Sequence, residues 1–471
     1  MVPGLSFVLA LMVELGGLSP AQADPGTLFV KLGGTGNACT QINPCALQTA
    51  LLQAMGGDTI YVAGGTYTGT GSTVINITKS VTLYGGWDGA TSGPVVRNPA
   101  PYPTALDGQK ARRDISMTGP ATVVLDGLTI ANGRVLSTII SPTLGARWDG
   151  GDLYARDVAL TLRRTHFYSN VVDAWGFTGS WAHGGDASVE GGILVVEEAV
   201  FQWNGARAVA QSFGGGLSLS GTLATTITNA LFRDNDAWQS SDASFLGGSS
   251  GDRPPLVLLG NTSVDNGRRK SGASSGGYAS AIRIDFAQAW VEGNTFRGGN
   301  VVNECGAVVV FNSHLLFARN LVYDNHGWPT SGLCLDSVSP FTLTNNIIAG
   351  NRSGPHAGFV AIRVKGGGGV FLHNTIARNI GPTGLVVDSA TVALTNTILV
   401  SHTVGISVGV GSTATLQGTL WGVSTWANGT DWTGPGTILT ETVNLRGNPA
   451  FVNPDSGDYH ITAASAAQDT G

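Results

Sequence analysis

The most constraining feature of this sequence is an imperfect repeat in which an asparagine lies three positions after an apolar residue. The clearest copies run from Phe167 to Asn170, Phe201 to Asn204, Phe232 to Asn235, Val322 to Asn325, Ile348 to Asn351 and Ile376 to Asn379. With the weaker members Ile130, Ser263, Phe296 and Ile398, the intervals between apolar positions are 37, 34, 31, 31, 33, 26, 26, 28 and 22 residues. Such a period is typical of a solenoid, whose stacked units bury one continuous core.

A second signal keeps step with the first. In four copies a glycine lies sixteen residues before the apolar position, at Gly151, Gly185, Gly306 and Gly332. The intervening segments hold short alternating strands, such as 192–196 and 217–220, rather than a helical period. Strands this short cannot bury an apolar face alone, so each coil must stack on the next at about 4.8 Å. The sequence therefore predicts an all-β fold, a single-stranded right-handed parallel β-helix of about 10–12 coils.

The recurring asparagines have a structural explanation in such a fold. Amides at the same turn of successive coils can donate and accept hydrogen bonds along the solenoid axis. We expect two ladders, formed by Asn294, Asn320, Asn346, Asn374 and Asn396 and by Asn325, Asn351 and Asn379. Ligand binding is the alternative explanation for these residues, but periodic recurrence favours the structural one.

The two ends of the chain differ from the repeats. An apolar run from Leu5 to Leu18 and the Ala-Gln-Ala at 21–23 predict a signal peptide over residues 1–23. Residues 46–55 predict a short helix with Leu47 and Ala50 on its apolar face, which would cover the first coil. We expect the N-terminal cap and first coils over 24–120, the repeats over 121–420, and a last coil with a C-terminal cap over 421–471.

Composition and cysteines limit the partners and the compartment. Only 12% of residues are charged and the net charge is −6, so no basic stripe is available for nucleic acid. After the leader, no run of eighteen apolar residues predicts a transmembrane helix. Four cysteines suit two disulfides in an oxidising compartment, Cys39 with Cys45 and Cys305 with Cys334, the latter pair about one repeat apart. We expect a monomer exported to the cell surface or the medium.

Three segments resemble known β-helix families. Residues 57–67, Gly-Asp-Thr-Ile-Tyr-Val-Ala-Gly-Gly-Thr-Tyr, look like the first coil of bacterial proteins of the pectin-lyase-like superfamily. The Phe-x-x-Asn copies at 201–204 and 232–235, interleaved with the glycines at 214–216, resemble the repeats of polymorphic outer-membrane proteins, which are autotransported adhesins. Residues 448–471 resemble the closing segment of bacterial surface β-helix proteins. The resemblance implies the fold far more than an activity.

The catalytic candidates are weak. Arg363-Val-Lys365 is similar to a substrate-binding motif of polygalacturonases, but the paired aspartates of that family are missing. The same pattern recurs as Ala281-Ile-Arg-Ile-Asp285, about three coils earlier, which predicts a repeated strand with an outward arginine. A lyase would need clustered carboxylates for Ca²⁺, and the candidates are Asp149, Asp152 and Asp186, with His183 nearby. Asp152 and Asp186 should lie on adjacent coils as Ca²⁺ candidates, or serve as turn aspartates bonded to the backbone.

Ligand binding is better supported in the long variable segments of the N-terminal half. These segments carry Trp148, Trp175, Trp181, Trp238 and Arg268. Tryptophans beside charged groups can stack on sugar rings while the charges bond hydroxyls, unless the loops bury their own aromatic residues. We expect a secreted or surface protein that binds a glycan without turning it over. The alternatives are a polysaccharide lyase or glycoside hydrolase on the same fold, and a structural spacer.

Overall fold

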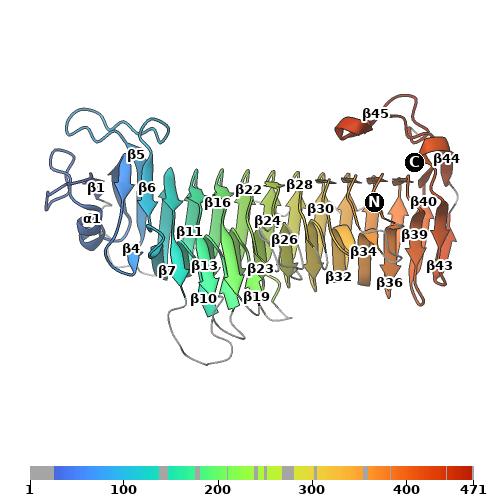
Figure 1. The fold of residues 1–471 in the computed structure, drawn as a ribbon, viewed down its shortest axis with the longest axis horizontal. Helices are drawn as coiled ribbons and strands as arrows, with labels where there is room; N and C mark the ends of the chain where they lie inside the picture. Colours follow the sequence, from blue (N-terminus) through green and yellow to red (C-terminus); the bar gives the residue numbers. More distant parts are fainter. Residues whose placement is uncertain are drawn as a thin grey trace, which may run out of the picture.

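The molecule is an elongated parallel β-solenoid with its coils stacked along one axis (Figure 1). The structure, a computed structural model, describes residues 26–468 apart from 137–146, 175–180, 209–210, 238–241, 249–251, 268–280, 302–304, 354–358, 382 and 442. The expected signal peptide, Trp175, Trp238 and Arg268 lie outside the described residues. One α-helix, α1 (Leu47–Gln53), and 46 strands make up the described fold together with two short 3-10 segments, which confirms the all-β class.

Each coil contributes strands to three faces. Faces 1 and 2 join into one sheet because β7 (Arg113–Asp126), β11 (Leu153–Arg163), β32 (Thr330–Thr344) and β34 (Val360–Leu372) run through the corner between them. Face 3 is a separate sheet of 14 strands. This number exceeds the 10–12 coils that the sequence predicted, because the first coils lack the asparagine motif by which the later coils were counted. All pairings on the three faces are parallel and in step from coil to coil.

The other strands are distributed over the faces as follows. Face 1 contains β4 (Thr73–Ile77), β15 (Ala187–Glu190), β20 (Leu217–Ser220), β23 (Ala243–Leu246), β26 (Ile282–Asp285), β29 (Val308–Phe311), β36 (Thr383–Asp388), β39 (Val404–Val408) and β42 (Thr430–Thr433). Face 2 contains β1 (Thr27–Val30), β2 (Asp58–Ala63), β5 (Val81–Trp87), β16 (Ile193–Glu197), β21 (Ala224–Thr228), β24 (Pro255–Leu259), β27 (Gln288–Glu292), β30 (His314–Ala318), β37 (Thr391–Thr395), β40 (Thr413–Gln417) and β43 (Thr437–Thr440). Face 3 contains β3 (Gly65–Tyr67), β6 (Thr104–Asp107), β8 (Leu128–Ala131), β12 (His166–Tyr168), β17 (Val200–Gln202), β22 (Leu231–Arg233), β25 (Thr262–Val264), β28 (Thr295–Arg297), β31 (Leu321–Tyr323), β33 (Ile347–Ala349), β35 (Thr375–Ala377), β38 (Ile398–Val400), β41 (Leu420–Gly422) and β44 (Leu445–Gly447).

The repeat motif encodes the interior and the corners. Its apolar residue points inward, and Phe167, Phe201 and Phe232 stack with ring centroids 4.9 and 4.8 Å apart. The residue before each ladder asparagine adopts a positive φ. At Ser169 and Asp324 it turns the chain out of face 3, and at His373 it turns the chain from face 2 into face 3. The apolar column and the left-handed corner together account for the period that the sequence shows.

The asparagine ladders are present, with one correction. Along the first, the backbone N–H of Asn320 donates to Oδ1 of Asn346 at 2.9 Å, and Asn346 in turn donates to Asn374. Asn325, Asn351 and Asn379 form the second ladder as expected. The assignment of Asn396 to the first ladder was wrong, because Thr397 holds the position after Asn374 and Asn396 is the left-handed corner residue before it.

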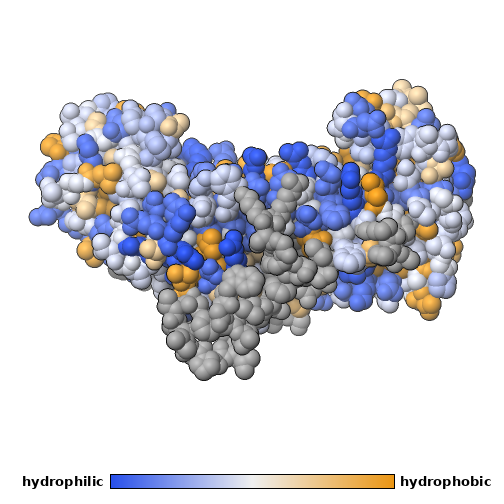
Figure 2. All heavy atoms as spheres, in the orientation of Figure 1, coloured by the Kyte–Doolittle hydropathy of each residue, from blue (hydrophilic) through white to orange (hydrophobic). Residues whose placement is uncertain are grey.

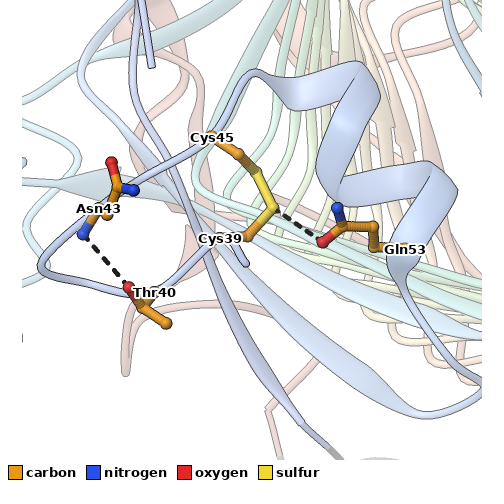
Figure 3. Close-up of a disulfide and its surroundings, with 5 residues drawn as sticks. All are labelled: Cys39, Thr40, Asn43, Cys45 and Gln53. Carbon is orange, nitrogen blue, oxygen red and sulfur yellow. Dashed lines mark hydrogen bonds between the residues drawn. A yellow bond between two sulfur atoms is a disulfide. The ribbon is translucent and has the colours of Figure 1, made fainter. Parts of the chain in front are cut away.

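Additional structure covers the first coil. Leu47 and Ala50 of α1 are buried, as expected for a capping helix. The Cys39–Cys45 disulfide closes the loop that precedes α1 (Figure 3). The second predicted disulfide, Cys305–Cys334, links neighbouring coils on face 1, with the two Cα atoms 6.0 Å apart. Both disulfide predictions are therefore confirmed.

The C-terminal segment does not cover the end of the last coil, where the sequence led us to expect a cap. After β44 it forms a hook, β45 (Phe451–Asn453), η2 (Pro454–Ser456) and β46 (Asp458–Ile461), which packs on the outer side of face 3. Among the described residues, no strand pairs with the free edges of β42, β43 and β44. The interior is closed instead by Trp432, which contacts Trp421, and by the Arg446–Asp431 ion pair. The hook rises on the same side as the N-terminal loops, and Figure 2 shows a hollowed surface between them.

The long variable segments of the N-terminal half form a projection that we call the fin. It consists of two three-stranded parallel sheets, β9 (Arg134–Leu136), β13 (Val171–Ala174) and β18 (Gly205–Ala208) in one, and β10 (Arg147–Asp149), β14 (Trp181–His183) and β19 (Gln211–Phe213) in the other. Small residues fill the space between them, among them Val172, Ala182 and Ala206. Figure 1 shows β10, β13 and β19 at one side of the solenoid. The segments that the sequence marked as variable loops are therefore stacked strands with a core of their own.

Candidate functional site

The fin meets face 1 in a surface corner where several sequence candidates converge. Successive side chains of a strand point to opposite sides, so Trp181 and His183 of β14 share one side of their sheet. That side lies against the outer surface of face 1, because His183 Nδ1 is 3.3 Å from Ser218 Oγ and Ser188 Oγ donates to Asp149 Oδ1 at 3.4 Å. The corner is thus walled by the fin and floored by β11, β15 and β20.

The floor carries a network of charged and phenolic groups. Tyr154 Oη donates to Glu190 Oε2 at 2.7 Å, and the guanidinium of Arg156 lies 3.2 Å from the same oxygen. The Arg113 guanidinium lies 5.4 Å from the centre of the Tyr154 ring, and its Nε donates to the Gly150 carbonyl at 2.8 Å. Arg156 is exposed and Glu190 half-buried, so the network opens to solvent at its outer end.

Sequence reasoning missed all four of these residues. Arg156 and Glu190 occupy the same register position on adjacent coils, four residues after Asp152 and Asp186 respectively. The spacing of 34 residues between Arg156 and Glu190 is the signal that could have identified an ion pair across coils. Tyr154 and Arg113 carry no such signal, because outward positions of the repeat vary freely in identity.

The wall of the corner is aromatic. Trp181 is 41% exposed, and its ring centroid lies 6.2 Å from that of His183, with a 29° angle between the planes. His183 is buried and stacks in turn on Phe213 at 5.0 Å. Trp148 lies on the opposite side of the same sheet and packs against the fin core. Trp181 is therefore the described candidate tryptophan that faces the corner, and Trp148 is part of the fin's packing.

Burial changes the titration of two floor residues. Burial, followed by the hydrogen bond to Glu190, raises the pKa of Tyr154 to about 12, so its hydroxyl remains a donor at neutral pH. Burial also lowers the pKa of Arg113 from its ordinary value, although nearby Asp149 opposes that shift. Tyr154 is therefore a hydrogen-bond donor in the corner and does not act as a base, and the carboxylate of Glu190 is the acceptor.

Asp152 and Asp186 lie on adjacent coils in register, as the sequence predicted, but their side chains are inside the solenoid. Asp114, Asp152 and Asp186 lie on three successive coils, and Asp242 holds the same position two coils further on, beyond Gly216; all four have 0% exposure. Burial raises the pKa of Asp152, Asp186 and Asp242 well above the ordinary value. Asn170 donates to Asp186 and Ser263 to Asp242, as expected for residues that brace turns. Among the described residues, these carboxyl groups are not arranged as a set that could hold a metal ion.

The polygalacturonase-like motif is a recurring strand, as predicted. Arg283 and Arg363 occupy one column of face 1, with Val309 and Cys334 between them, and are three coils apart. Arg283 donates to Asp285 at 2.8 Å and lies 4.6 Å from the Phe311 ring centre. Within the described residues, no group of three or more His, Cys, Asp or Glu side chains is arranged to hold a metal ion, and no helix is long and apolar enough to cross a membrane.

Comparison with known proteins agrees with the coil architecture. Residues 215–420 match the family described as the right handed beta helix region. Similar solved structures include the periplasmic alginate epimerase AlgG, at 12% identity over 70% of this chain and 76% of that one, with a TM-score of 0.40. Tailspike protein 3 of bacteriophage CBA120 is 12% identical over 89% of this chain and 61% of that one, with a TM-score of 0.41. No curated protein matches the chain.

The stacked parallel coils define the fold class, and the matched segment agrees with it. The chain folds as a right-handed parallel β-helix, which confirms the fold that the repeats and the pectin-lyase-like resemblance predicted. That class hosts several unrelated activities, so function has to be argued from the surface corner itself.

Proposed function

We propose that this protein is an exported polysaccharide-binding protein whose ligand lies in the corner between the fin and face 1. The observation that carries the proposal is an exposed tryptophan, Trp181, on a wall next to a floor of hydrogen-bonding charged groups. Concave sites that combine an aromatic surface with a few fixed polar groups are the usual form of ligand sites. The two disulfides are typical of proteins outside the reducing cytosol and support export.

The corner suits a sugar chain chemically. The indole of Trp181 presents an apolar surface for the C–H face of a sugar ring. Arg156 donates and Glu190 accepts, so the two can bond vicinal hydroxyls on the adjoining unit. Because Glu190 already receives hydrogen bonds from Tyr154 and Arg156, its orientation is set before a ligand arrives, which lowers the entropic cost of binding.

A glycan array probed with residues 24–471 tests the proposal. We expect binding to a restricted set of polysaccharide fragments, lost in Trp181→Ala. Trp328→Ala is the matched control, because Trp328 is 42% exposed and lies five coils further along the solenoid. Absence of binding to any glycan would contradict the proposal and favour a structural spacer.

A second candidate, a lyase or hydrolase, is favoured by one observation. Arg113, Asp149 and Glu190 combine two carboxylates with an arginine of lowered pKa in the same corner. The discriminating assay incubates the array hits with the protein, with and without Ca²⁺, and measures unsaturated and reducing sugar. Release that is abolished by Glu190→Gln would replace the binding proposal by catalysis.

A further inference from the structure

A second concave surface lies at the opposite end of the solenoid, between face 3 and the hook. Its floor is the outer column of face 3 formed by Ile347, Thr375, Ile398 and Leu420 on four successive coils. Its far wall is β46, with Tyr459, His460 and Ile461. We call this space the hook groove; the hook itself, with β45, is in the upper right of Figure 1.

The rim of the groove is a row of polar corner residues. Asn345, His373 and Asn396 occupy equivalent corners of three successive coils, each with a φ between 49 and 55°. Coils are spaced at about 4.8 Å, so the row presents an amide, an imidazole and an amide at regular steps. Amides both donate and accept hydrogen bonds, and an imidazole offers two ring nitrogens, so the row can hydrogen-bond to hydroxyl groups.

The hook is held firmly against the coils, so the groove is formed before any ligand binds. Arg378 of the coil wall forms an ion pair with Asp455 and lies 4.4 Å from the Trp426 ring centre. Phe451 contacts both Trp426 and Tyr459 edge to face, at 5.0 and 5.1 Å. Burial of these aromatic rings fixes β46 at its distance from the corner row.

The lining determines the class of ligand. None of the described residues that line the groove is Asp, Glu, Lys or Arg, His460 of the wall is paired with Asp458, and the floor carries the Thr375 hydroxyl among three apolar side chains. A ligand must therefore combine an apolar face with a rim of uncharged hydroxyls. A sugar ring of a neutral oligosaccharide has this form, and an extended chain can contact successive coils.

We propose that the hook groove is a second binding site, specific for a neutral oligosaccharide. The site is independent of the corner beside the fin, because it shares no residue with it and lies on another face of the solenoid. Binding there would let one rigid rod hold two glycan segments at once, which increases the apparent affinity for a polymer without new contacts.

Isothermal titration of residues 24–471 with cellohexaose, mannohexaose and maltohexaose tests the site, with a hexagalacturonate as the acidic probe. We expect at least one neutral hexaose to bind, with a Kd about tenfold weaker in His373→Ala and in Thr375→Val, since each variant removes hydrogen bonds to hydroxyls. His326→Ala is the matched control, because His326 is also exposed but lies outside the groove.

The outcomes separate the groove from the corner. Trp181→Ala should leave the binding of the neutral hexaose unchanged. The proposal is overturned if no neutral hexaose binds at millimolar concentration, if hexagalacturonate binds as tightly as the best neutral probe, or if His373→Ala and Thr375→Val both bind like the wild type. Thr375→Val preserves side-chain volume, so it tests the site even where a corner substitution at His373 weakens folding.

Discussion

At the scale of single residues, the interior carboxyl column has the largest consequence for stability. Asp152 is completely buried, and burial together with the neighbouring Asp114 raises its pKa well above the ordinary value. The folded state therefore holds a proton that the unfolded chain releases above about pH 4. Stability from this group is full at low pH and decreases as pH rises from about 4 toward the raised pKa of the folded state.

Asp152→Asn should remove this dependence. The amide is neutral at every pH and nearly isosteric, so the variant should be more stable than the wild type at pH 8 and similar to it at pH 4. The difference in free energy of unfolding between the two proteins should approach about 1.4 kcal/mol for each pH unit between the pKa of Asp152 in the unfolded chain and its raised pKa in the folded state. Urea denaturation at the two pH values measures it, and an equal effect at both would show that the carboxyl is not protonated in the fold.

At the scale of elements, the sequence predicts the features that repeat from coil to coil. The inward phenylalanines, the left-handed corners and the asparagine ladders repeat from coil to coil, so their pattern is visible in one sequence. The fin could not be predicted, because its strands are short and its core consists of small residues such as Ala182 and Ala206. Asp149, His183 and Trp181 were recognised as candidates, whereas Tyr154 and Arg156, which bind Glu190 on face 1, were not.

The ladders make a direct prediction for stability. Asn346 accepts a hydrogen bond from the backbone of Asn320 and donates hydrogen bonds both to Phe317 and to Asn374. Its side chain is buried, so water cannot replace these hydrogen bonds. Asn346→Ala should therefore cost about 2–4 kcal/mol, from lost hydrogen bonds and unpaired buried groups. Asn396→Ala, outside the ladder, should cost less than about 1.5 kcal/mol. Chemical denaturation of both variants measures the two losses in free energy of unfolding. Equal losses in Asn346→Ala and Asn396→Ala would contradict the stabilising role of the ladder.

At the scale of the whole molecule, the rod carries two separate candidate binding surfaces on one support. The fin corner lies against face 1 and the hook groove against face 3, toward opposite ends of the solenoid. The coils between them carry ion pairs such as Arg283–Asp285 and Lys365–Asp336 on face 1. Each candidate surface therefore combines side chains of the coils with side chains of one addition, the fin or the hook.

Export belongs to this scale too and rests on the sequence. The apolar leader and the Ala-Gln-Ala at 21–23 predict cleavage before Asp24. Expression of the complete chain in a bacterial host with an intact secretion system, followed by N-terminal sequencing of the exported protein, should yield a chain that starts at Asp24. Recovery of the protein only in the cytoplasm with residues 1–23 retained would contradict export.

We propose that a glycan binds where the fin meets face 1. The most direct measurement is a calorimetric titration of the best array ligand into the wild type, Trp181→Ala and Trp328→Ala, with melting temperatures recorded for all three. We predict that Trp181→Ala weakens binding at least tenfold with an unchanged melting temperature, while Trp328→Ala binds like the wild type. Equal affinities in all three proteins, or a large loss of stability in Trp181→Ala, would contradict the account.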